Sequence, residues 1–363
     1  YERFLKERNE EQWVAKTALS QMVSTLMTHI ANADGHYSGF STELGDIATS
    51  LAGDVSAKEL DALMDRAVRA TNSALEQGKE LKQQGFTAQA LDAFTEAIED
   101  NPKLTEAHLS IGDIFREQAA YEKADAAYRK AVVSDPNNFD ARYLLGLTNH
   151  LSGDLQRAIS SYKRALVINK DSYEANREMG SAIMQSGKPG EAIEFSKRAV
   201  EINPESQTGW ANLAAAYSLT GDYENAVGAY RQTLALGDAA IPVLLGLANA
   251  HIQLGNYQRA ENVLNAIERE GGNPIARERM GLVLFKQSKF LSASEAYRKV
   301  LADQPNDTAA LNGLGISLMA IYLRGGEEDD KLRVEALVHW RRSLSLRPEQ
   351  GKIIDLLSRY AEE

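Results

Sequence analysis

The sequence predicts an all-α solenoid built from about eight helix-turn-helix repeats. Alanine recurs mostly at a step of 34 residues, a second set of residues follows each alanine at helical spacing, and glycines and prolines recur between the helical stretches. A single globular core needs no such period. A stacked array does, because each repeat buries its apolar face against its neighbours. The alanines, with final steps of 33 and 43, are Ala90, Ala124, Ala158, Ala192, Ala226, Ala260, Ala293 and Ala336.

The second half of each repeat is an amphipathic helix that contains this alanine. In the first three repeats an aromatic residue follows four positions later and an alanine seven positions later, as with Phe94 and Ala97 after Ala90. Residues at these spacings share one helical face. We therefore expect the alanine where the two helices of a repeat approach most closely. We expect the aromatic side chains to fill the gap between one repeat and the next.

Turn residues separate the helices of this pattern. Prolines end the repeats because a helix does not continue through them. The glycines inside the repeats are Gly85, Gly153, Gly187, Gly221 and Gly255, and the closing prolines are Pro102, Pro136, Pro204, Pro305 and Pro348.

The combined pattern resembles the tetratricopeptide repeat (TPR) family, whose signature is W-x2-L-G-x2-Y, then A-x3-F, then P. The fullest match is Trp210, Leu213, Ala214, Tyr217, Gly221, Ala226 and Tyr230. The resemblance covers residues 71–348 and implies a right-handed α-solenoid. The expected repeats are about 71–104, 105–138, 139–172, 173–206, 207–240, 241–273, 274–307 and 308–348.

Two segments near the end of the chain depart from the repeat. Residues 324–333 are charged and rich in glycine, so we expect a mobile loop inserted into the last repeat. Residues 349–363 are expected to form a capping helix at about Ile353–Tyr360.

Residues 1–70 do not follow the repeat. Apolar residues at helical spacing predict a helix from Trp13 to about Asn32, a second helix before Gly53, and a third that begins with the capping box Ser56–Glu59. This segment resembles the helical regions between modules of bacterial signalling proteins. The alternative is a cap that shields the first repeat, which the ends of a solenoid require.

Composition narrows the classes of function. The chain has no cysteine, which excludes thiol catalysis and cysteine-ligated metals, and its six histidines show no metal-binding spacing. We therefore expect no enzymatic activity, metal or cofactor. The net charge of −11 disfavours nucleic acid as a partner, and no apolar stretch is long enough to insert into a membrane. We expect a cytoplasmic protein; the chain begins with Tyr1, which leaves an upstream signal or anchor open.

The resemblance also indicates where a partner would bind. In TPR proteins the first helix of each repeat lines a concave groove. The groove residues that this implies here are Tyr143, Leu147, Arg177, Asn212, Leu245, Asn249, Arg279, Leu282 and Phe285. The apolar members can hold a peptide, the two asparagines can bond its backbone, and Arg177 and Arg279 are expected to be cations available to acidic groups.

Two specialised recognition patterns of the family are absent. The residues matching the carboxylate clamp of chaperone-binding members are Leu75, Lys79, Ser110, Asp140 and Leu144, so only one cation remains. The asparagine ladder of glycosyltransferase-linked members is missing as well. The sequence thus predicts a non-catalytic scaffold or adaptor that binds a protein or peptide. The alternatives are a regulatory module of a larger bacterial signalling protein, of the receiver or diguanylate cyclase type, and a self-assembling structural protein that forms homo-oligomers.

Overall fold

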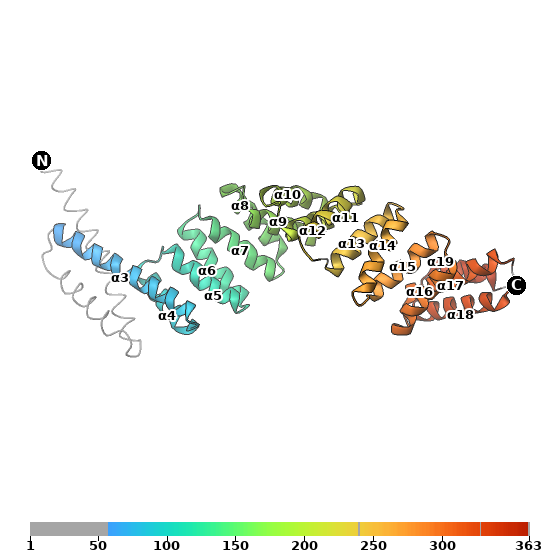
Figure 1. Ribbon diagram of the computed structural model, residues 1–363. Helices are drawn as coiled ribbons and strands as arrows, with labels where there is room; N and C mark the ends of the chain where they lie inside the picture. The colour runs from blue at the N-terminus through green and yellow to red at the C-terminus, as the bar shows by residue number, and fades with distance from the viewer. Residues whose placement is uncertain (1–56, 239, 327, 362–363) are drawn as a thin grey trace. The chain divides into compact units, whose positions relative to one another are not determined.

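The structure is a computed structural model that describes residues 57–361 except 239 and 327, and within these residues every regular element is an α-helix (Figure 1). The chain divides into two compact units, with the boundary between Ala182 and Ile183. We call them unit 1 and unit 2. Each helix packs mainly on the helices before and after it in its unit, as expected for a stacked array.

Unit 1 consists of successive antiparallel helices and ends within α9. The helices are α3 (Ala57–Gln83), α4 (Thr87–Asp100), α5 (Thr105–Glu117), α6 (Tyr121–Ser134), α7 (Phe139–Leu151), α8 (Leu155–Ile168) and α9 (Tyr173–Gln185). In this unit α5, α7 and α9 are first helices of repeats, and α4, α6 and α8 are second helices.

Unit 2 continues the alternation of first and second helices. Its helices are α10 (Pro189–Ile202), α11 (Gln207–Thr220), α12 (Tyr223–Leu236), α13 (Ile241–Gln253), α14 (Tyr257–Arg269), α15 (Pro274–Lys286), α16 (Phe290–Asp303), α17 (Thr308–Arg324), α18 (Asp330–Leu346) and α19 (Gly351–Tyr360).

The first described helix crosses the boundary that the sequence analysis places between residues 70 and 71. Helix α3 is a single helix of 27 residues, so the third predicted helix and the first helix of the array are one element. Neither a glycine nor a proline interrupts the chain from Ala57 to Leu75, and nothing in this stretch ends a helix. The two helices predicted before Gly53 lie outside the described residues.

The eight repeat alanines have the buried position that the sequence predicts. Each one, from Ala90 to Ala336, has no exposed surface. A larger side chain at such a crossing would force the two helices apart. The 34-residue step of the sequence therefore reports a steric limit that every repeat meets.

The aromatic residues after these alanines pack differently from the prediction. The ring of Tyr162 lies against Gly146 of the same repeat, so a Cβ at Gly146 would be 2.7 Å from Tyr162 Cδ1. Phe94 meets Gly78 and Trp340 meets Gly315 in the same way. Two rings do reach the next repeat as expected: Tyr230 lies against Gly246, and Tyr297 lies against Gly313 as well as Gly281 of its own repeat. Glycine on the first helix leaves room for the ring, and this draws the aromatic side chain inward.

The inserted segment 324–333 is not the predicted loop. Arg324 is the last residue of α17, and Asp330–Arg333 form the first turn of α18, so only residues 325–329 connect the two helices. Both helices have 17 residues. The added residues continue the helices because their inner side chains pack: Leu332 contacts the core around Trp340, and Arg333 Nη1 donates to the Tyr360 carbonyl at 3.0 Å.

Helix α19 covers the end of unit 2 at the position expected from the sequence. Ile353 is buried in the same core as Trp340, and Leu356, Leu357 and Tyr360 pack against it. The helix begins at Gly351, two residues before the expected start.

We predict that Gly146→Ala lowers the free energy of unfolding by about 1–3 kcal/mol, since the new methyl group overlaps the buried ring of Tyr162. Glycine-to-alanine substitution inside a helix otherwise stabilises by roughly 1 kcal/mol. Gly228→Ala in α12 is the matched control, because a Cβ there meets nothing within 4 Å. In urea unfolding, the free energy of unfolding should be higher for Gly228→Ala than for the wild type, and lower for Gly146→Ala. A Gly146→Ala protein as stable as the wild type would contradict the packing described.

A buried carboxyl group in unit 1 makes stability depend on pH. Asp100 is the last residue of α4 and is buried against α3, where Asp100 Oδ2 accepts a hydrogen bond from Thr71 Oγ1 at 3.2 Å. Burial raises the pKa of Asp100 to about 7, the Thr71 hydrogen bond opposes the shift, and Glu96 and Glu99 add to it. The folded chain thus binds this proton more tightly than the unfolded chain does.

We predict that Asp100→Asn removes a loss of stability between about pH 4 and pH 7. In this window the unfolded state has released the proton and the folded state has not, so the wild type loses stability as the pH rises. Above about pH 7 this stability is not regained. The variant should gain about 1–4 kcal/mol relative to the wild type between about pH 4.5 and pH 8. Urea unfolding of both proteins across this range measures the difference. A constant difference would show that Asp100 titrates normally.

Candidate functional site

The nine predicted groove residues all lie on first helices, and all are half-buried. They are therefore neither core residues nor freely exposed side chains. In unit 2 the first helices contact each other in succession, α11 with α13, α13 with α15 and α15 with α17. We call the surface that these helices present the first-helix face. It is described separately for each unit.

In unit 1 the first-helix face carries an aromatic cluster on α7. The ring of Tyr143 stacks on Phe139 at 5.9 Å and lies 6.0 Å from the ring of Tyr162. The imidazole of His150 meets Tyr162 edge-on at 6.3 Å. Leu147 lies on the same helix between Tyr143 and His150 in sequence and is half-buried. The cluster offers ring faces and edges for contact with a partner.

Charged groups from α9 complete this cluster. Arg177 forms an ion pair with Glu178, and its guanidinium carbon lies 5.9 Å from the centre of the Tyr173 ring. Glu178 Oε2 is 3.5 Å from His150 Nδ1, which links α9 to α7. Arg177 is thus engaged by Glu178 and Tyr173, and the sequence-based expectation of a cation available to a partner does not fit this arrangement. The pairing depends on side-chain rotamers, which spacing along a helix does not determine.

The electrostatics of the cluster favour an ionised Glu178. Burial alone would raise the pKa of Glu178, but the hydrogen bond with His150 and the positive charge of Arg177 outweigh it and leave that pKa below its usual value. Burial raises the pKa of Tyr143, and the Glu178 carboxylate raises it further. Tyr162 Oη is buried and has no hydrogen-bond partner among the described residues. The cluster therefore holds one carboxylate charge and one unsatisfied hydroxyl beneath its aromatic surface.

In unit 2 two successive first helices, α11 and α13, carry no formal charge. Charged residues make up 25% of the chain, yet α11 and α13 contain no Asp, Glu, Lys or Arg. The side chains of Asn212 on α11 and Asn249 on α13 make no hydrogen bond to any residue that the structure describes. Half-buried Leu245 lies on α13 as well. This surface offers amide groups and apolar contact without formal charge.

Helix α15 supplies the remaining predicted residues. Arg279 Nη1 donates to the Leu245 carbonyl at 2.8 Å, which ties α15 to α13. Its role as a cation for acidic partner groups was a prediction from sequence, and the structure shows at least one donor used inside the protein. Leu282 and Phe285 are half-buried, and the rings of Phe285 and Phe290 lie 5.2 Å apart. The apolar surface thus extends from Leu245 to α15.

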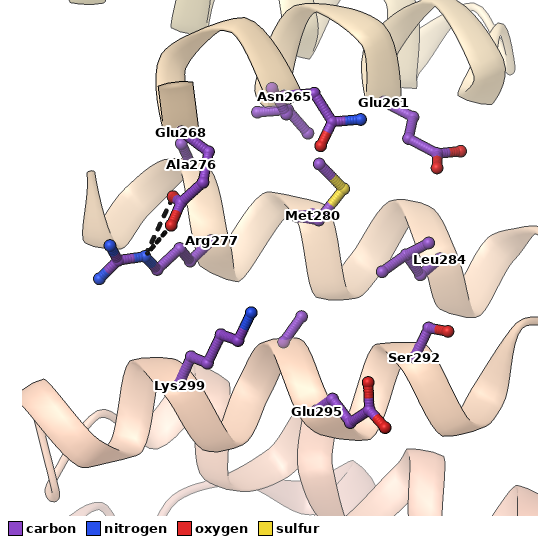
Figure 2. Close-up of a pocket in the computed structure, with 12 residues that line it drawn as sticks. Glu261, Asn265, Glu268, Ala276, Arg277, Met280, Leu284, Ser292, Glu295 and Lys299 are labelled. Carbon is purple, nitrogen blue, oxygen red and sulfur yellow. Dashed lines mark hydrogen bonds and ion pairs between the residues drawn. The ribbon is translucent and has the colours of Figure 1, made fainter. Parts of the chain in front are cut away.

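The structure also contains a pocket that the sequence analysis missed (Figure 2). It lies between the second helices α14 and α16, with α15 between them, and has a volume of about 320 Å³. A signal for it is present in the sequence. The eighth residue after each repeat alanine is apolar in seven repeats and is Glu268 in the other one.

Two classes of site are not found in the described part of the chain. No group of three or more His, Cys, Asp or Glu side chains is arranged there to hold a metal ion. None of the helices described combines the length and hydropathy that a transmembrane span needs.

Comparisons with known proteins agree with this architecture. Two profiles of the tetratricopeptide repeat family match, one at residues 75–138, 121–174 and 278–321 and the other at residues 217–277, and together they cover more than half of the chain. A search of curated proteins returned no match.

Three solved structures similar to this chain share between 16% and 23% of aligned residues with it. One is the MamA protein, at 23% identity over 46% of this chain and 91% of that chain, with a TM-score of 0.44. A second is PilF of Pseudomonas aeruginosa, at 20% identity over 58% of this chain and 97% of that chain, with a TM-score of 0.49. A third is YrrB, described as a TPR protein with an unusual peptide-binding site, at 16% identity over 55% of this chain and 100% of that chain, with a TM-score of 0.46.

We predict that Arg177→Glu lowers the free energy of unfolding by about 1–3 kcal/mol, because it removes the cation beside half-buried Glu178 and puts a second carboxylate there. Arg164→Glu is the control, since Arg164 is exposed on α8 and its change should stay within about 0.5 kcal/mol. Thermal and urea unfolding of both variants measure the difference. Equal stabilities would mean that the Arg177–Glu178 pair does not support the fold.

Proposed function

Because the chain belongs to the tetratricopeptide repeat family, we propose that it is a non-catalytic scaffold that binds a segment of a partner protein on its first-helix face. TPR proteins bind protein or peptide partners and are generally non-catalytic. The proposal is narrower than this family property. It places an extended, uncharged segment of the partner on α11 and α13 of unit 2, next to the apolar residues of α15.

The observation that carries the proposal is the absence of formal charge on α11 and α13 in a chain that is one quarter charged. A neutral surface disfavours charged partners, because a charge buried against it loses its water and finds no opposite charge. Extended peptide backbone has the matching chemistry. An asparagine amide donates to a backbone carbonyl and accepts from a backbone N–H, and the side chains of Asn212 and Asn249 have no partner within the described residues.

The apolar part of the surface supplies the remaining contact area. Leu245, Leu282 and Phe285 are half-buried, so each still presents apolar surface that a partner can cover. The hydrogen bond from Arg279 to the Leu245 carbonyl holds α15 against α13 and fixes these side chains relative to each other. A surface that is already ordered loses less entropy on binding.

The sequence also suggested a regulatory role in a signalling protein and self-assembly into a structural protein. A regulatory role in a signalling protein depends on residues 1–70, of which 1–56 lie outside the described residues. Self-assembly into a structural protein would appear as a mass above that of the monomer in light scattering of the full chain.

We predict that peptides selected from a random displayed library against the full chain contain fewer charged residues than the library. Replacing Asn212 and Asn249 together by aspartate should weaken their binding at least about tenfold, because the new carboxylates repel backbone carbonyls and lose hydration on binding. Fluorescence anisotropy with the selected peptides measures this. Gln232→Glu, on the exposed face of α12, is the control and should bind like the wild type. Charged peptides whose binding survives the double substitution would contradict the proposed site.

A further inference from the structure

The pocket of unit 2 lies on the side of α15 away from the first-helix face. Ala276, Met280 and Leu284 of α15 face it. At 3.6 residues per turn these residues lie on the opposite side of the helix from Leu282 and Phe285. Figure 2 shows α15 running between the two second helices that form the walls. A ligand here would therefore not compete directly with one on the first-helix face.

Glu268 lines the pocket, and at this residue one repeat departs from the pattern of the others. The corresponding residues in the other repeats are apolar: Ile98, Val132, Leu166, Val200, Leu234, Leu301 and Leu344. An apolar side chain at this position packs on the next repeat, as Leu234 does between two cores. Glu268 instead turns to Arg277, whose Nε lies 3.0 and 3.1 Å from the two carboxylate oxygens, and Arg277 Nη1 also bonds Asp303 at 2.7 Å. The ion pair takes the place of a side chain that would cover α15.

The uncovered residue is Met280. At the seventh position of the other first helices, Met179, Leu213, Leu247 and Leu314 are almost fully buried, whereas Ile111 and Leu145 of unit 1 are half-buried. Met280 is only half-buried. Leu264 and Ala296 complete the apolar lining. Methionine adapts its shape to a ligand more readily than a branched side chain does.

The rim of the pocket carries unsatisfied polar groups of both signs. Glu295 and Lys299 are one turn apart on α16, yet neither forms an ion pair or hydrogen bond within the described residues, and the same holds for the amide of Asn265 on α14. Figure 2 shows Lys299 toward the Arg277 end and Glu295 toward the Ser292 end. Since Arg277 is already neutralised by Glu268 and Asp303, the unpaired charges at the rim are one cation and one carboxylate.

We propose that this pocket docks an amphipathic helix of a partner protein. The helix inserts apolar side chains above Met280 and Leu284, and it places a carboxylate toward Lys299 and a cation toward Glu295. Residues four apart on a helix lie one above the other, so a helix beside α16 presents its two charges at the same spacing as Glu295 and Lys299. A volume of about 320 Å³ accommodates a few apolar side chains, and apolar anchors with flanking charges are the usual features of helix-in-groove recognition.

Two stapled helical peptides test the charge pattern. Both peptides carry leucine at positions i and i+4 on one face. At the edge of that face, the first peptide has Glu four residues before Lys, and the second has Lys four residues before Glu. The full-length wild type should prefer one order at least about threefold, as two rim ion pairs allow. The double variant Glu295→Lys, Lys299→Glu should prefer the opposite order. Equal binding of both peptides to the wild type, or an unchanged preference in the double variant, overturns the proposal.

Glu268→Leu tests the pocket itself. It restores the apolar residue that the other repeats have, so the urea midpoint should stay equal or rise while both peptides bind at least about tenfold more weakly. Glu194→Leu, an exposed substitution on α10, should leave peptide affinity unchanged, and so should the aspartate substitutions at Asn212 and Asn249. Peptide affinity that survives Glu268→Leu in a stably folded protein overturns the proposal. Loss of binding on substitution of Asn212 and Asn249 also overturns it, because it would place these peptides on the first-helix face.

Discussion

The close approach of two helices at a buried alanine is the constraint on which the rest of this structure depends. With no exposed surface at any of the eight alanines, the helix pair of each repeat has one permitted separation. That separation brings second-helix rings within van der Waals reach of the first helix, and a glycine there leaves room for the ring, as Gly146 does for Tyr162. In five of the eight repeats the alanine, the glycine and the ring act as one packing unit, and its recurrence sets first helices beside first helices.

Residues that break the repeat are more informative about function than residues that keep it. Some departures are tolerated without consequence for the surface: Ala119 and Ser288 take the left-handed backbone conformation that Gly85 and Gly255 take at the same turn, with φ of 56° and 61°. Glu268 is different, because it puts an ion pair with Arg277 where the other repeats have an apolar side chain, and it lines a pocket. The uncharged helices α11 and α13 are a departure in composition and leave the packing intact.

The sequence was sufficient for the elements that repeat. Periodic alanines, glycines and prolines identify the helix pairs because the same short-range packing recurs, and the predicted groove residues are half-buried for the same reason. The sequence did not predict the interactions that occur only once in the array. The pairing of Arg177 with Glu178 and the bond from Arg279 to the Leu245 carbonyl depend on rotamers of long side chains, which have several alternatives of similar energy. Composition predicts a loop at the charge-rich segment 324–333, because it does not reveal that Leu332 reaches a core.

The two proposed surfaces of unit 2 differ in the physics of association. The neutral face of α11 and α13 has no charge with which to steer a partner, so affinity there depends on apolar contact and amide hydrogen bonds and changes little with salt. The pocket at Glu295 and Lys299 adds ion pairs at a solvated rim, which salt screens. Both surfaces use α15, but on opposite sides of the helix. Because each repeat of a solenoid contacts mainly its neighbours, a ligand at either surface acts first on the repeat that contains α15.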